Sequence, residues 1–288
     1  MQQTGTGNPP EQQTTAHLAE VFDRAAPSYD RTGVEFFSLI GQRLVARVPL
    51  RPGDDVLDLG CGRGACTFPA ARAVGSGGSV TAIDVSPEMV ARTAALAAGA
   101  GLGQVAVSTG DASDPAFAPG SFDAITAGLV VFMLPDPAAA IRVYHDLLRP
   151  GGTFAMSLFG ADDPAFFEVT AGALPFLEGG LPPVPGRDSS PLRSRDGAQD
   201  LLRRSGLVGV ELAQEHLDLV FTGPDQWWDW LWQTAGRVVL EQIPPDRLPA
   251  ARAEMARRME AVRDERGSFL THWEVWCVRG TAPGGDRP

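Results

Sequence analysis

The most informative part of this sequence is Val56-Leu-Asp-Leu-Gly-Cys-Gly-Arg-Gly64. Its first four residues predict a short buried strand, three glycines follow at alternate positions, and the residues from Ala65 onward predict a helix. Glycine has no Cβ and tolerates positive φ, so the backbone of such a bend can lie close to a ligand. The helix behind it presents free N–H groups. The stretch therefore predicts a small-molecule site at the end of a strand.

The spacing of the glycines narrows the class of ligand. A dinucleotide fingerprint reads G-x-G-x-x-G, whereas Gly60, Gly62 and Gly64 read G-x-G-x-G, with Asp58 two residues before the first glycine. No phosphate-loop lysine follows, and the whole chain contains no lysine. The pattern D-x-G-x-G-x-G is similar to motif I of the class I methyltransferases, which use S-adenosylmethionine (SAM). The alternative is a glycine-rich turn in another α/β protein.

Two further segments carry the same resemblance. Residues 21–30, Val-Phe-Asp-Arg-Ala-Ala-Pro-Ser-Tyr-Asp, resemble the F-D-x-x-A-x-x-Y-D segment of small-molecule methyltransferases, including those of quinone biosynthesis. Residues 147–154, Leu-Leu-Arg-Pro-Gly-Gly-Thr-Phe, resemble the L-x-P-G-G connection before the fifth strand of that family. The resemblance implies that N-terminal helices cover bound SAM and that Tyr29 lies near its methionine end. The alternative for Tyr29 is a packing residue at a helix end.

Composition argues against several classes of protein. The 288 residues are 44% apolar and 20% charged, and no apolar run approaches the roughly 20 residues of a membrane helix. The net charge of −11 and the lack of a basic stripe argue against nucleic acid and membranes as partners. The polar N-terminus lacks a signal pattern and predicts a cytoplasmic protein. The three cysteines, Cys61, Cys66 and Cys277, predict neither a disulfide framework nor a metal site.

Strand and helix signals alternate from residue 56 to residue 159, which predicts an α/β fold with a doubly wound, Rossmann-like sheet. Ser86 before Pro87 and Glu88 is typical of a helix N-terminus. The resemblance implies seven strands, of which the seventh is antiparallel and pairs with the sixth. A helical cap is expected between these two. The strands are expected at residues 56–59, 79–85, 104–109, 122–129, 153–159, 208–221 and 271–279.

The chain is expected to contain six parts. Residues 1–15 form a disordered tail, residues 16–50 form helices over the cofactor site, and residues 51–160 form the SAM-binding core. Residues 161–193 are a proline-rich lid excursion, and residues 223–266 are a Trp-rich insert with helices at 225–242 and 246–266. The rest of the sheet comes from residues 194–222 and 267–282.

Two carboxylates are expected at the carboxyl ends of neighbouring strands, where a doubly wound sheet binds its ligand. Asp84 ends the second strand and is suited to both ribose hydroxyls; the alternative is a helix-cap acid. Asp111 follows the third strand, and the resemblance places it at the adenine amino group; the alternative is an Asx turn. The full set of candidate cofactor-binding residues is Tyr29, Asp58, Gly60, Cys61, Gly62, Gly64, Asp84, Val85, Met89, Gly110, Asp111, Ala112, Gly128 and Leu129.

No catalytic base is assigned from the sequence. An oxygen acceptor usually needs one, and histidine is the first candidate. His17 and His272 are weak candidates, whereas His145 is expected on an exposed helix and His216 in a strand. A carbon acceptor, or an already acidic phenol or carboxyl, needs no base.

The aromatic residues suggest the nature of the acceptor. Four tryptophans in the insert span more of a helix than one core contact needs, so we expect a substrate lid, a partner subunit (a homo-oligomer) or both. The alternative is a core helix with many aromatics. A largely apolar acceptor cavity is expected beneath the insert and the lid excursion. These tryptophans are Trp227, Trp228, Trp230 and Trp232.

The sequence thus predicts a SAM-dependent methyltransferase that acts on oxygen or carbon of a small, largely apolar metabolite and releases S-adenosylhomocysteine. A SAM-binding cyclase on the same fold and a non-catalytic interaction protein are the alternatives. The glycine spacing disfavours an NAD-dependent reductase.

Overall fold

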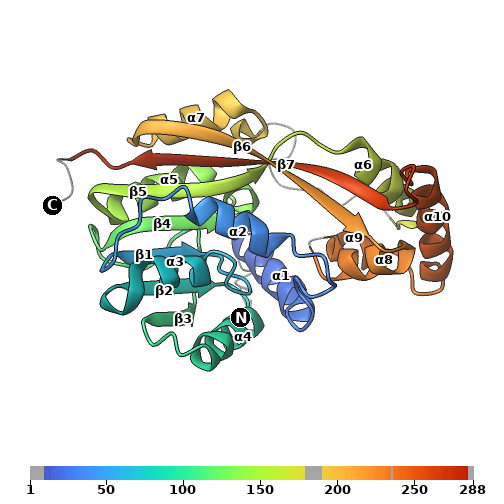
Figure 1. Cartoon of the computed structure of the whole chain (residues 1–288), viewed down its shortest axis with the longest axis horizontal. Coiled ribbons are helices and arrows are strands. Elements are labelled where there is room, and N and C mark those ends of the chain that lie inside the picture. Colours follow the sequence, from blue (N-terminus) through green and yellow to red (C-terminus); the bar gives the residue numbers. More distant parts are fainter. Residues whose placement is uncertain (1–9, 179–189, 235, 285–288) are drawn as a thin grey trace, which may run out of the picture.

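The computed structural model describes residues 10–178, 190–234 and 236–284. One sheet of seven strands has the order β3-β2-β1-β4-β5-β7-β6 (Figure 1). The pairs among β1 to β5 are parallel, and β7 is antiparallel to both β5 and β6, which confirms the predicted sheet. The strands are β1 (Asp55–Leu59), β2 (Ser79–Asp84), β3 (Val105–Thr109), β4 (Phe122–Gly128), β5 (Leu148–Phe159), β6 (Val208–Phe221) and β7 (Phe269–Thr281).

Helices cover both faces of the sheet. Leu44 and Val45 of α2 (Phe37–Val45) and Ala70 of α3 (Thr67–Val74) share one core with β1, β2 and β4. On the other face, α5 (Pro137–Leu147) and α7 (Arg195–Arg204) bury their apolar sides against β4, β5 and β7. The helix α4 (Pro87–Gly99) lies beside β3. Two buried layers around a mostly parallel sheet give the expected doubly wound architecture.

The strand order reverses between β1 and β4, because β1 pairs with β2 on one side and with β4 on the other. Ligands of doubly wound sheets bind at this point, beyond the carboxyl ends of the strands. The glycine bend follows β1 directly, and Asp84 is the last residue of β2. The fold therefore brings the sequence motifs to one edge of the sheet.

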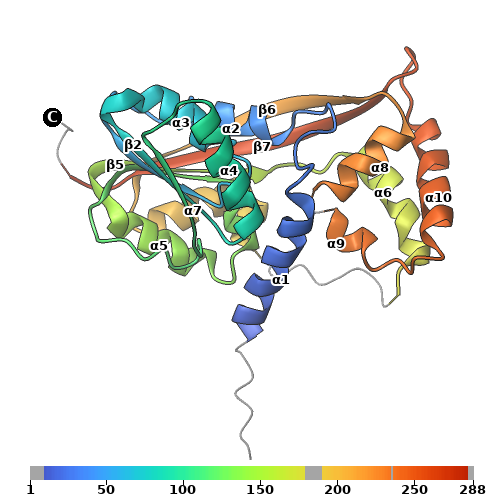
Figure 2. The same ribbon diagram turned by 90° about the horizontal axis from the view of Figure 1, so that it is seen from below.

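A second core lies around the far half of the long β6–β7 hairpin (Figures 1 and 2). The hairpin pairs from Val208↔Thr281 to Phe221↔Phe269, so it extends well beyond β5. Its buried side chains pack on four short helices from the lid excursion and the insert. These helices are α6 (Pro164–Thr170), α8 (Pro224–Trp232), α9 (Arg237–Leu240) and α10 (Leu248–Ala261).

The N-terminal boundary differs from the expectation. The helix α1 (Pro10–Ala25) begins before His17, so residues 10–15 are helical and are not part of a disordered tail. The expectation for residues 1–9 lies outside the described residues, as does the part of the lid excursion at residues 179–189. The start of α1 was not predicted, because Gln and Thr at residues 12–15 give no apolar periodicity. A helix can form without such periodicity.

The insert also differs from the expectation. A continuous helix was predicted over residues 225–242, but α8 ends at Trp232 and α9 begins at Arg237. Thr234 Oγ1 donates to the carbonyl of Leu231, and Arg237 Nε donates to the carbonyl of Trp232, so side chains satisfy the carbonyls that a continuing helix would use. The last predicted helix is shorter as well, because α10 ends at Ala261.

Among the described residues, no helix has the length and apolarity needed to span a membrane.

Candidate active site

The three glycines of the bend have left-handed backbone conformations, with φ of 61° at Gly60, 50° at Gly62 and 86° at Gly64. A Cβ on Gly60 would overlap Val130, and a Cβ on Gly64 would overlap the ring of Phe68. The Cβ position of Gly62 has no atom within 4 Å. Gly60 and Gly64 therefore permit close packing within the protein, whereas Gly62 leaves open space for a ligand.

Asp84 holds this bend in place. Its Oδ2 accepts a hydrogen bond from the Gly62 N–H at 2.8 Å, and its Oδ1 accepts one from the Ser86 N–H at 2.9 Å. The side chain is only 7% exposed, and burial raises its pKa against the lowering effect of these N–H groups. Ser86 caps α4 by accepting from the Met89 N–H, as the sequence predicted. Asp84 thus fixes the bend and is not the cap of α4.

Asp111 forms the Asx turn that was the alternative for this residue. Its Oδ1 accepts hydrogen bonds from the N–H and the hydroxyl of Ser113, both at 2.7 Å. Asp111 nevertheless lines the same cavity as Asp84, together with Gly110 and Ala112. The turn therefore orients the carboxylate and does not remove it from the site.

We call the space beside these residues the glycine-bend cavity. It is lined by every candidate cofactor-binding residue except Asp58, Cys61 and Gly64. Its volume of about 100 Å³ is below the roughly 300–1,000 Å³ typical of small-molecule sites. Three residues of α1, Thr15, Leu18 and Phe22, line the cavity and narrow it. Sequence analysis missed seven lining residues, namely Thr15, Leu18, Phe22, Val130, Met133, Leu134 and Pro135.

Two contacts fasten α1 above the cavity. Asp23 Oδ1 accepts from the Ser86 hydroxyl at 2.5 Å and from the Glu88 N–H at 3.1 Å, which ties α1 to the N-terminus of α4. Arg63, within the glycine bend, donates to the carbonyl of Ala26 at 2.7 Å. The aspartate of the segment at residues 21–30 therefore positions the covering helix.

Asp58 lies beneath the bend, away from both cavities. It is 1% exposed, and its carboxylate accepts hydrogen bonds from Thr67 Oγ1 at 2.6 Å and Thr126 Oγ1 at 2.9 Å. Burial raises its pKa to about 6. Asp58 joins β1, α3 and β4, so a structural role accounts for its contacts.

Asp58 predicts a pH dependence of stability. The pKa of Asp58 is about 6 in the folded state, above the value of about 3.9 in the unfolded state. Its contribution to the free energy of unfolding is therefore complete below about pH 4 and is lost as the pH rises through 6. From pH 4 to pH 7, the Asp58→Asn variant should gain roughly 2–3 kcal/mol in unfolding free energy relative to the wild type. Urea unfolding at several pH values measures this.

Asp55→Asn is the control of opposite sign. The Ser79 hydroxyl and Arg149 lower the pKa of Asp55, so its contribution is present above the unfolded pKa and is lost as the pH falls. If the unfolding free energy of Asp58→Asn depended on pH as that of the wild type does, this would contradict the raised pKa of Asp58.

A second, larger space adjoins the first, and we call it the aromatic cavity. Its volume is about 480 Å³, and its walls come from the region between α1 and α2, the end of β5, α6 and the insert. The aromatic residues that line it are Phe22, Tyr29, Phe36, Phe37, Phe132, Phe159, Phe166, Phe167, Trp230 and Trp273. An apolar cavity of this size suits a small organic molecule.

The two cavities meet at four residues that line both: Phe22, Tyr29, Leu129 and Met133. Tyr29 stacks on Phe37 with 4.6 Å between ring centroids. Leu129 has φ of 57°, which is uncommon for a residue other than glycine, and its N–H donates to the Ser157 hydroxyl at 3.0 Å. A strained residue that is held in place where two cavities meet is typical of a functional site.

Comparison with known proteins agrees with this geometry. Residues 56–152 match a family model described as a methyltransferase domain. Nocamycin O-methyltransferase of Saccharothrix syringae is 41% identical over 287 residues, covering 93% of this chain and 100% of that protein. The chain belongs to the SAM-dependent methyltransferases. A second relative is aklanonic acid methyltransferase DauC of Streptomyces sp. (strain C5). It is 41% identical over 160 residues, which cover 56% of this chain and 69% of that protein.

A solved structure agrees in fold. The YcgJ protein of Bacillus subtilis has a TM-score of 0.58 and 18% identity, covering 86% of this chain and 99% of that one. The family confirms SAM as the cofactor of the methyltransferase. The cyclase and interaction-protein alternatives are not favoured, because the relative that matches over 93% of the chain is named as an O-methyltransferase.

The structure does not bring either histidine candidate to the methyltransferase's cavities. The side chain of His17 is exposed and lines neither of them. His272 is 66% exposed, and its Nδ1 lies 2.7 Å from Asp218 Oδ1 on the neighbouring strand. The pairing of β6 with β7 places His272 opposite Asp218, and this register was not readable from the local sequence.

The tryptophans of the insert are covered within the chain. Trp230 lines the aromatic cavity, and Trp227 packs on Phe221 with 4.8 Å between ring centroids. Trp228 and Trp232 lie edge to face, and the guanidinium groups of Arg252 and Arg237 lie over their rings. The second surface expected for these residues is thus supplied by the same chain. Homo-oligomerisation through the insert stays a prediction.

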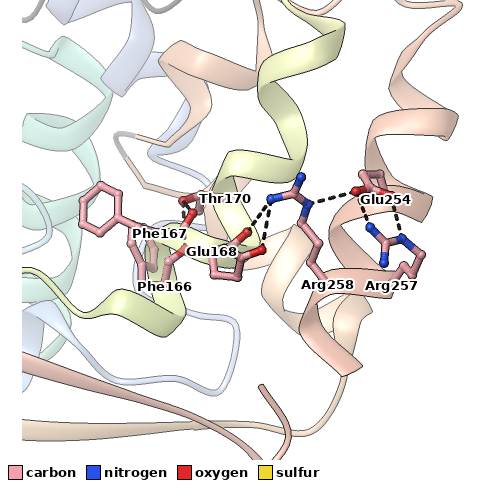
Figure 3. A network of polar contacts seen from close by, with 7 residues as sticks. All are labelled: Phe166, Phe167, Glu168, Thr170, Glu254, Arg257 and Arg258. Carbon is pink, nitrogen blue, oxygen red and sulfur yellow. Dashed lines mark hydrogen bonds and ion pairs between the residues drawn. The ribbon is translucent and has the colours of Figure 1, made fainter. Parts of the chain in front are cut away.

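One arginine holds α6 against α10 (Figure 3). Arg258 on α10 donates to Glu254 at 2.9 Å and reaches the carbonyl and carboxylate of Glu168 on α6, both at 3.2 Å. Arg257 binds only Glu254 among the residues drawn in Figure 3. Because α6 supplies Phe166 and Phe167 to the aromatic cavity, Arg258 positions one of its walls.

Replacing Arg258 by alanine is expected to loosen this wall. Binding of naphthylmethanol, a neutral apolar probe, should weaken about threefold to tenfold, and the unfolding free energy should fall by about 1 kcal/mol. Arg257→Ala is the matched control, since Arg257 is 69% exposed and Arg258 25%, and it should leave both the probe affinity and the unfolding free energy nearly unchanged. Calorimetric titration and urea unfolding measure both. Equal probe affinities in the two variants would argue against a positioning role.

Proposed function

We propose that this methyltransferase transfers the methyl group of SAM to an acidic oxygen of a small, largely apolar secondary metabolite. The observation that carries the proposal is the junction of the two cavities at Phe22, Tyr29, Leu129 and Met133. A donor beside the glycine bend and an acceptor among the aromatic rings would face each other there. The name of nocamycin O-methyltransferase favours oxygen as the methylated atom, and the name of aklanonic acid methyltransferase favours an acidic acceptor.

The residues present fit SAM. Gly62 has no side chain to fill the cavity beside the bend, and Asp84 presents a carboxylate suited to the ribose hydroxyls. Asp111 and the Ala112 N–H lie at the same cavity and are suited to the adenine edge. SAM supplies a methyl group on a positively charged sulfur. The protein's contribution is to hold the acceptor in line with that group, and orientation alone is worth on the order of 7–11 kcal/mol.

The junction offers no strong base. Among the described residues that line both cavities, Tyr29 alone is titratable, and burial raises its pKa well above the ordinary value. A tyrosine in that state does not accept a proton near neutral pH. The acceptor oxygen is therefore expected to be acidic enough to ionise by itself, as a phenol or carboxyl is.

The proposal is tested in two steps. Isothermal titration with SAM should give saturable binding to the purified protein. Incubation with SAM and a panel of phenolic and carboxylic polyketide-like metabolites should add one methyl group to a panel member and release S-adenosylhomocysteine, both read by mass spectrometry. SAM binding with no methylated product across the panel would count against the acceptor class, and failure to bind SAM would count against the site.

Tyr29→Phe is expected to keep methyl transfer within about threefold of the wild type and to leave the pH profile of kcat unshifted, because the ring and not the hydroxyl packs at the junction. Tyr29→Ala should lower turnover by about tenfold or more, since it removes a stacked ring that lines both cavities where they meet. Steady-state rates from pH 6 to 9 with an acceptor from the panel measure both. A shifted pH profile in Tyr29→Phe would indicate that the hydroxyl takes part in proton transfer.

A further inference from the structure

Four charged side chains line the otherwise apolar aromatic cavity: Asp162, Asp163, Arg193 and Glu274. Asp163 uses both carboxylate oxygens, which accept from the N–H groups of Ala165 at 2.8 Å and His272 at 2.6 Å. Asp162 pairs with Arg193 at 3.4 Å. No ion pair of Asp163 or Glu274 is found within the described part of the chain. Two backbone N–H groups stabilise the Asp163 carboxylate, whereas Glu274 accepts only from an indole N–H, so its carboxylate is the less compensated of the two.

Glu274 is held in a defined position. Its Oε1 accepts from the indole N–H of Trp276 at 2.5 Å, and its carbonyl accepts from the Gly160 N–H at 2.8 Å. A Cβ on Gly160 would lie 2.6 Å from both Cγ and Oε1 of Glu274, so the glycine makes room for this carboxyl group. Oε2 accepts no hydrogen bond from the residues that the structure describes, which leaves it for a ligand.

The surroundings of this carboxylate favour a cation. A carboxylate beside apolar walls is costly unless it gains a charged partner. Aromatic side chains, including Trp273 and Phe159, line other parts of the same cavity, and aromatic faces attract ammonium groups. A hydroxyl could bond to Oε2, but it would leave the charge uncompensated. The net charge of the four side chains is negative, which disfavours an anionic group at this end of the cavity.

We infer that Glu274 determines acceptor specificity by binding a protonated amino group of the acceptor. This inference rests on the proposed function, because it takes the aromatic cavity as the acceptor site. The acceptor class becomes an apolar, aromatic metabolite with an acidic oxygen at one end and an amine at the other. The amine pairs with Glu274 while the oxygen lies at the junction.

Three probes that share one ring system test the inference: naphthylmethylamine, naphthylmethanol and naphthoate, titrated into the full-length protein at low salt. We expect the wild type to bind the amine about tenfold more tightly than the alcohol, and naphthoate most weakly. Glu274→Gln keeps an oxygen for Trp276 but removes the charge, so it should bind amine and alcohol equally. Gly160→Ala should reduce the preference, because its Cβ displaces the carboxyl group.

Asp218→Asn is the matched control. It removes one negative charge from the neighbouring strand outside the cavity, so the preference for the amine should persist. Equal binding of amine and alcohol by the wild type, or an unchanged preference in Glu274→Gln, would overturn the inference. Titration with SAM reports on the proposed function separately, because Glu274 does not line the glycine-bend cavity. Should Glu274→Gln fail to bind SAM through misfolding, Gly160→Ala decides the question.

Discussion

Replacing Asp84 by asparagine is expected to weaken SAM binding by about 100-fold or more, which corresponds to about 3 kcal/mol. In the variant, an NH2 group faces the N–H of either Gly62 or Ser86, so one backbone donor loses its acceptor. At the proposed donor site, the ribose hydroxyls would lose a charged acceptor as well. Both effects act on the same bend, because Asp84 connects the end of β2 to the glycine that leaves room for the ligand. Isothermal titration with SAM measures the loss.

Asp136→Asn is the control for general damage. Asp136 caps α5 by accepting from the Ala139 N–H at 2.9 Å, and it lines neither cavity. This variant should bind SAM like the wild type and should lose at most about 1 kcal/mol of stability. If Asp84→Asn bound SAM within a few-fold of the wild type, the glycine-bend cavity would not be the donor site.

Trp230→Ala is expected to weaken ligand binding in the aromatic cavity without affecting SAM binding in the glycine-bend cavity. Trp230 is 4% exposed, and its ring centroid lies 5.9 Å from that of Trp273 and 6.0 Å from that of Phe36. Its removal should lower the unfolding free energy by about 3–5 kcal/mol and should weaken naphthylmethanol binding by about tenfold. SAM affinity should stay within about twofold, because Trp230 does not line the glycine-bend cavity.

Trp232→Ala provides the comparison within the same helix. Its ring lies against Trp228 and Arg237, outside the aromatic cavity, so the probe should bind with nearly unchanged affinity. Urea unfolding and calorimetric titration distinguish the two variants. A Trp230→Ala protein that bound the probe normally would show that the aromatic cavity is not the acceptor site.

Much of the donor site was predictable because it depends on local rules. The alternating strand and helix signals predict a doubly wound sheet of parallel strands, and the carboxyl ends of parallel strands meet at one edge. Gly62, Asp84 and Asp111 each lie at the carboxyl end of a strand or within three residues of it, so their meeting required no knowledge of side-chain packing. Asp58 was predicted at the same site but lies beneath it, since the threonines that bind it come from α3 and β4.

The acceptor side was less predictable. Sequence composition indicated an apolar cavity beneath the insert and the lid excursion, and Trp230 does line one. The sequence did not reveal which of the four tryptophans faces it, nor that Arg252 and Arg237 cover Trp228 and Trp232. These contacts join residues that are distant along the chain or lie across a helix break, and no local pattern encodes them.

The sequence by itself determined the glycine bend and the carboxylates at the carboxyl ends of β2 and β3, because each depends on backbone conformation or on short-range periodicity. The antiparallel last strand was implied by the resemblance to the methyltransferase family. Only the tertiary structure decided that Phe22, Tyr29, Leu129 and Met133 join two cavities and that His272 turns outward beside Asp218. It also decided that Glu274 lines the aromatic cavity with an oxygen that accepts no hydrogen bond from the described residues. The physical reason is that a cavity forms between surfaces that meet only when the covering helix, the sheet and the insert have packed together.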